Sequence, residues 1–177
     1  MSADQAACRC VLCLDPGVLD DVTQLTVEQV EKHGWQVTMI PADEQGPGWA
    51  YTVGLWHTYR IPELAMFGLD IELMRGILDN LGRLAVDGRV LEPDQERSDV
   101  ATVPVVLKDV DYRWYKAFFG TAIDFYGRPP FPYLQVVWPT RGGAFPWQPG
   151  GAALFSHQPQ LWLHPDSHPA GVWTEGL

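Results

Sequence analysis

Three cysteines fall within six residues near the start of the chain: Cys8, Cys10 and Cys13. Domains held by disulfides spread an even number of cysteines along the chain. An odd, local cluster therefore points to a reducing compartment, the cytoplasm, and to metal or thiol chemistry. The Cys10-x-x-Cys13 spacing is that of a zinc knuckle, in which one turn of the chain offers two thiolates to one ion, and Cys8 would add a third.

A tetrahedral metal site needs a fourth donor. We expect His33 to complete a zinc site with the three cysteines, while the remaining histidines and an external molecule stay open as alternatives: His57, His157, His164 and His168. A histidine in the fourth position would make the site structural, and an open position would make it catalytic.

Two other interpretations of the cysteines remain open. A Cys-x-x-Cys pair lowers the pKa of one thiol and allows reversible disulfide or persulfide formation, which would make the cluster catalytic. Alternatively, the cysteines are only small, partly buried residues of an N-terminal arm. The sequence alone does not choose among metal, sulfur chemistry and a structural role.

A second group combines two histidines, a carboxylate and two aromatic residues: His33, Trp35, Tyr51, His57 and Glu63. If the two segments that carry the last three residues pair as strands, His57 and Glu63 could act as a general acid and base. Trp35 and Tyr51 would then bind the substrate. The structural alternative is that Glu63 caps backbone amides and that His33 ends a helix, where its cation suits the helix dipole.

A third candidate is the Trp138–Trp147 segment, in which two glycines separate Arg141 from Trp147. Arg141 could hold a carboxylate or phosphate, and Trp147 could form the wall of a pocket. The same proline and tryptophan content also suits a loop anchored against a core.

These side chains must be positioned by one domain of mixed structure. Apolar periodicity, caps and glycine stops predict helices over 21–33, 70–86 and 112–126. Alternating or continuous apolar runs predict strands over 35–40, 49–55, 64–69, 103–110 and 133–138. Residues 57–62 are expected to form a loop, and 89–101 an exposed connection.

The element order lacks regular alternation of strand and helix. It therefore predicts an α+β fold with a mostly antiparallel sheet packed by about three helices. We expect a cysteine-bearing arm over 1–19, the α+β domain over 20–150, and an irregular tail over 151–177 that packs on the domain.

Four ordered motifs resemble the bacterial DUF4262 family, whose function is uncharacterised. They are His33-Gly34-Trp35, Tyr51–Leu55, Pro62–Leu69, and Gln135–Pro139 followed by Gly143–Trp147. The resemblance covers residues 8–150 and implies a bacterial cytosolic domain with no established reaction. Many members carry a Cys-x-x-Cys arm, and this chain departs from them by adding Cys8.

The charge and apolar content of the chain limit the classes of partner that it could bind. The 12 Lys and Arg against 22 Asp and Glu give a net charge of −10, which disfavours nucleic acid. No apolar run of about 18 residues exists to span a membrane, and no secretory signal is visible.

The leading hypothesis is a small-molecule enzyme, of a specialised biosynthetic pathway, that uses the cysteine cluster beside the His/Glu/aromatic pocket. The alternative is a non-catalytic interaction domain, immunity-like or regulatory, with the cysteines as a structural clip.

Overall fold

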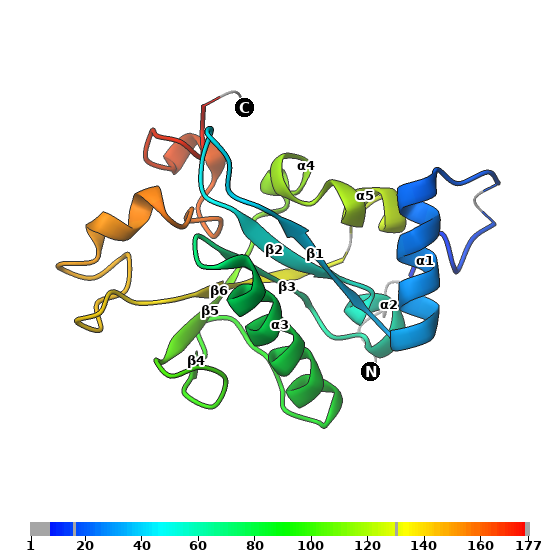
Figure 1. Cartoon of the computed structure of the whole chain (residues 1–177), viewed down its shortest axis with the longest axis horizontal. Coiled ribbons are helices and arrows are strands. Elements are labelled where there is room, and N and C mark those ends of the chain that lie inside the picture. Colours follow the sequence, from blue (N-terminus) through cyan, green and yellow to red (C-terminus); the bar gives the residue numbers. More distant parts are fainter. Residues whose placement is uncertain (1–7, 16, 130, 176–177) are drawn as a thin grey trace, which may run out of the picture.

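The computed structural model describes residues 8–15, 17–129 and 131–175, so residues 1–7 and Pro16 of the expected arm lie outside it. A six-stranded sheet has the order β1-β2-β3-β6-β5-β4, with helices on both faces (Figure 1). The strands are β1 (Gln36–Ile40), β2 (Trp49–Val53), β3 (Glu63–Phe67), β4 (Glu96–Arg97), β5 (Val105–Asp109) and β6 (Tyr133–Val137). β3 and β6 run parallel and the other four pairings are antiparallel, which confirms the α+β class.

Both faces of the central strands β3 and β6 are buried. On β3, Leu64 and Met66 pack in one core with α3 (Ile71–Val86). Ala65 and Phe67 point the other way, into an aromatic core built by α4 (Tyr115–Phe118) and α5 (Gly120–Tyr126). Because successive side chains of a strand face opposite sides, a strand covered on both faces is apolar throughout.

The two long helices begin and end where the sequence predicts. The Asp20 carboxylate accepts hydrogen bonds from Val22 N and Thr23 N, both at 3.0 Å, and caps α1 (Asp21–His33). Gly34 ends that helix at φ 89°, a left-handed conformation that glycine adopts without strain. Asp70 caps α3 in the same way. None of the helices in the described part of the chain has the length and hydropathy needed to cross a membrane.

Three local predictions need correction. The expected loop over 57–62 begins inside a short helix, α2 (Leu55–Tyr59), which lies between Gly54 (φ 115°) and Arg60 (φ 59°). The expected helix over 112–126 is broken at Phe119, whose ring stacks on Tyr133 with centroids 4.1 Å apart. Tertiary packing therefore overrides the continuous helical pattern.

The connection over 89–101 is also less exposed than expected. It buries Leu91 and Val100 in the core below α3 and contributes β4 to the edge of the sheet. Arg97 is buried and paired with Asp99 at 2.6 Å. This polar segment is therefore partly packed against the domain.

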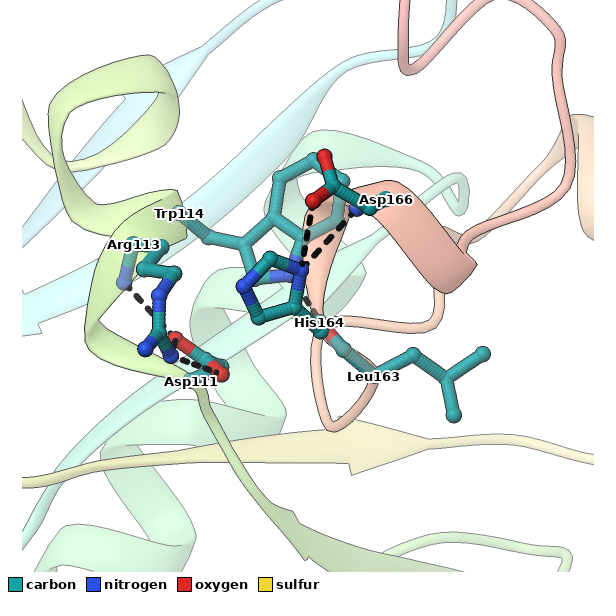
Figure 2. A network of polar contacts seen from close by, with 6 residues as sticks. All are labelled: Asp111, Arg113, Trp114, Leu163, His164 and Asp166. Carbon is teal, nitrogen blue, oxygen red and sulfur yellow. Dashed lines mark hydrogen bonds and ion pairs between the residues drawn. The ribbon is translucent and has the colours of Figure 1, made fainter.

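The chain after β6 is irregular, and we call its residues 139–175 the tail, a segment longer than the one expected over 151–177. Tryptophans attach this tail to the domain. Trp114 donates its indole N–H to the Leu163 carbonyl at 2.8 Å, and the neighbouring His164 approaches Asp166 (Figure 2). Trp173 of the tail is buried between Phe67 and Phe118. Buried aromatic rings thus hold the tail against the domain, although the described part of the tail has only short helical turns.

Candidate metal centre

The N-terminal arm brings its three cysteines to one histidine. The Nδ1 atom of His57, on α2, lies 3.8 Å from Cys8 Sγ, 3.1 Å from Cys10 Sγ and 3.5 Å from Cys13 Sγ. All four donor atoms lie within 4.8 Å of one another. Cys8 and Cys10 are buried, His57 is half-buried and Cys13 is exposed.

A tight turn after Cys10 shapes the cysteine side. The Cys10 carbonyl accepts hydrogen bonds from Cys13 N and Leu14 N, both at 3.0 Å, which returns Cys13 to the same side as Cys10. Burial raises the pKa of the Cys10 thiol to about 12, while the N–H groups of Leu12 and Cys13 donate to its sulfur and oppose that rise. One backbone bond, from Val11 N to the Phe125 carbonyl at 2.9 Å, attaches the arm to α5.

The histidine is positioned by the next residue of α5, Tyr126. Tyr126 directs its hydroxyl at the first turn of α2, where it accepts hydrogen bonds from Gly54 N and His57 N, each at 3.2 Å. The same hydroxyl donates to Glu63 at 2.5 Å. Because Phe125 holds the arm and Tyr126 holds α2, two adjacent residues fix both halves of the donor set.

Glu63 is fully buried beneath α2. One oxygen accepts from Gly54 N at 2.8 Å and Trp56 N at 3.1 Å, and the other accepts from the Thr52 hydroxyl at 2.6 Å. Burial raises the pKa of Glu63, and its hydrogen-bond donors oppose the rise. The carboxyl group therefore caps the backbone of α2 and fixes the position of the helix.

Arg60 closes the other end of α2. Its guanidinium donates to the Trp56 carbonyl at 2.7 Å and the His57 carbonyl at 2.9 Å. Burial lowers the pKa of His57, and the charge of Arg60 lowers it further. Both effects favour the neutral imidazole, the form that binds metals.

The sulfur–nitrogen separations suit a tetrahedral ion. Zinc–sulfur bonds of about 2.3 Å and zinc–nitrogen bonds of about 2.0–2.1 Å, at tetrahedral angles, separate a sulfur from a nitrogen by about 3.6 Å. The three measured S–N separations, 3.1–3.8 Å, bracket that value. Thiolate and imidazole are also the ligands that structural zinc sites use.

The histidine that lies beside the cysteines is not the one expected to complete the zinc site. His57, rather than His33, lies with the cysteines, because α2 folds where a loop was expected and carries His57 to the arm. His33 is the exposed last residue of α1 and lines a cavity with Trp35.

The expected acid–base pair is not brought together as a pair of side chains. Glu63 reaches His57 only through the Tyr126 hydroxyl and the backbone of α2. Tyr51 is 2% exposed and packs between Phe119 and Tyr133 in the aromatic core, so its position suits a core residue rather than a substrate contact.

The third group lies elsewhere. Arg141 is exposed in a turn, and Trp147 stacks on Phe145 and receives Lys108 Nζ at 4.6 Å from its ring centroid. Their segment, 139–150, lies at the end of the molecule away from α1 and α2 (Figure 1). Trp147 thus serves as an aromatic anchor for the tail.

Sequence reasoning missed Tyr126 and Thr52 as partners of Glu63. Tyr126 falls within the helix expected over 112–126, and the residue is 2% exposed. The available signal was its hydroxyl: a buried tyrosine oxygen needs a polar partner, and a carboxylate is a suitable one.

Comparison with known proteins gives a family but no described relative. The domain of unknown function DUF4262 matches residues 29–152. No curated protein and no solved structure matches the chain. The matched range includes His57 and Glu63, whereas the three cysteines precede it. Since the match spans more than half of the sequence, the chain belongs to the DUF4262 family.

Proposed function

We propose that this protein is a zinc-binding domain, in which Cys8, Cys10, Cys13 and His57 hold one ion. The observation that carries the proposal is the convergence of three thiols on one imidazole nitrogen at separations suited to a tetrahedron. Free cysteines also suit a reducing compartment, and we propose the cytoplasm.

We propose a structural role for the ion. Four protein donors complete a tetrahedron, whereas catalytic zinc sites keep one position for water or substrate. The ligands come from two parts of the chain, the arm and α2, so the ion would fasten one to the other. This role favours the non-catalytic clip over an enzyme that reacts at the metal.

Elemental analysis of the purified protein, with thiol titration before and after chelation, tests this proposal. We expect about one zinc per chain. Cys10→Ser should lose it, and His57→Gln should bind it more weakly. His33→Gln is the matched control and should keep full metal content, because His33 lies outside the donor set.

Substituting Co²⁺ for zinc gives a second readout. A thiolate-rich tetrahedral Co²⁺ site absorbs strongly in the visible, and the band should weaken in His57→Gln but not in His33→Gln. A protein with no metal and three reactive thiols would overturn the proposal and favour sulfur chemistry.

A further inference from the structure

A separate cavity of about 630 Å³ opens at the β1 edge of the sheet, between α1 and α3. Six of the residues that line it carry the argument: Gln29, His33, Trp35, Arg75, Asp79 and Arg83. Its volume is within the range of small-molecule sites, about 300–1,000 Å³. None of these residues belongs to the proposed zinc site.

The cavity brings two arginines together in an acidic protein. Arg75, Asp79 and Arg83 follow one another at intervals of four residues, which places them along one face of α3. His33 approaches from the end of α1. The chain has only 12 Lys and Arg against 22 Asp and Glu, so two arginines beside one acid in a single cavity lining depart from the average surface.

Existing contacts leave donors for a ligand. Asp79, the one acid of the lining, accepts the indole N–H of Trp35 at 3.2 Å. Arg75 pairs with the exposed Glu72 through one nitrogen at 3.3 Å, and a guanidinium has five N–H donors. In the described part of the chain, strand β1 is also the edge of the sheet, where alternate backbone N–H groups have no strand partner.

The indole of Trp35 lines the cavity and is held in place by its neighbours. Tyr59 contacts it edge-on, with centroids 6.0 Å apart, and Gly82 lies behind it. A Cβ atom at position 82 would come within 3.2 Å of the ring. Glycine inside a helix lowers helix stability, so its presence in α3 is explained by the close approach of the indole.

We propose that this cavity binds a small planar molecule that carries an oxyanion, either a carboxylate or a phosphate. Arg75 and Arg83 donate hydrogen bonds to the oxyanion, and the planar group lies against Trp35. A guanidinium fork matches both oxyanions, and the aromatic face matches a ring.

Calorimetric titration with benzoate and with phenyl phosphate tests the site, with neutral benzamide as the control ligand. We expect saturable binding of at least one anion, and affinity lower by about tenfold or more in Arg75→Gln and in Arg83→Gln. Arg128→Gln removes another exposed arginine, outside the cavity, and should leave affinity unchanged. The anion that binds more tightly distinguishes a carboxylate from a phosphate ligand.

The Trp35 indole N–H resonance, assigned from Trp35→Phe, should shift on titration with the same anion. The proposal is overturned if neither anion binds, if benzamide binds equally well, or if the three arginine variants lose affinity alike. Because the arginines are on the surface, unchanged melting temperatures will show that the variants are folded. Metal content plays no part in this test, so its outcome is independent of the zinc proposal.

Discussion

The N-terminal arm, residues 8–15, meets the domain through three thiols directed at one histidine, one backbone hydrogen bond to α5, and contacts of Val11 and Leu12 with the aromatic core. The C-terminal tail, residues 139–175, instead buries rings such as Trp173 and receives the indole N–H of Trp114. A short arm has little apolar area to bury, so directional ligand bonds can replace it. The longer tail combines the burial of rings with hydrogen bonds to the domain, such as that from Leu161 N to the Gln135 side chain. We therefore expect metal to control the arm and leave the tail unaffected.

Removing the metal should have the largest effect, and it should be confined to the arm. Arg9 and Arg141 are both exposed, and they offer trypsin one site in each region. Chelation should raise the cleavage rate at Arg9 by about tenfold or more, because cleavage follows the population of the released arm. The rate at Arg141, read from the same digest by mass spectrometry, should not change. Equal acceleration at both sites would show that the ion supports the whole domain.

Truncating Trp173, a buried aromatic residue of the tail, should lower the stability of the domain without affecting the arm or its metal. Trp173 is 7% exposed and contacts the rings of Phe67 and Phe118. Trp173→Ala should lower the free energy of unfolding by about 3–5 kcal/mol in urea denaturation, with metal content unchanged. Trp147, which is 40% exposed, provides the control, and Trp147→Ala should cost about 1 kcal/mol. Loss of metal in Trp173→Ala would contradict the independence of the two regions.

A smaller effect is expected at Glu63, which supports α2 on the arm side. Glu63→Gln should lower the free energy of unfolding by about 2–3 kcal/mol, since one amide cannot accept all the bonds of the carboxylate. It should also weaken metal binding while leaving the tail's cleavage rate unchanged. Glu72→Gln, at an exposed carboxylate on α3, is the control.

The pH dependence of stability gives Glu63 a second signature. Burial raises the pKa of Glu63 in the folded state above its ordinary value of 4.5, so the folded state holds this proton more tightly than the unfolded state. Its contribution to stability is therefore full below pH 4.5 and is lost as the pH rises toward the folded-state pKa. In metal-free protein this decline should be present in the wild type and absent in Glu63→Gln. Parallel pH profiles would exclude a raised pKa.

The features that could be predicted from the sequence are those that depend on residues close together along the chain. Asp20 and Asp70 are caps that act on neighbouring amides, so α1 and α3 could be located to within a residue. The cysteine cluster was visible because its members are close in sequence. The choice of His57 over His33 was not visible, because it depends on how α5 packs against both the arm and α2. Glu63 shows the same limit: a buried cap and a catalytic base are the same residue type until its neighbours are known.

The composition of the donor set has a consequence for folding. Cys8, Cys10 and Cys13 are close together in any conformation of the chain, whereas Cys13 and His57 are 44 residues apart. Gathering the fourth ligand in an unfolded chain would require closing a loop of that length, at an entropic cost of about 4 kcal/mol. The folded domain holds His57 in place already. A site of this kind therefore discriminates between the two states, and a metal ion bound there would shift the folding equilibrium toward the native fold in proportion to its free concentration.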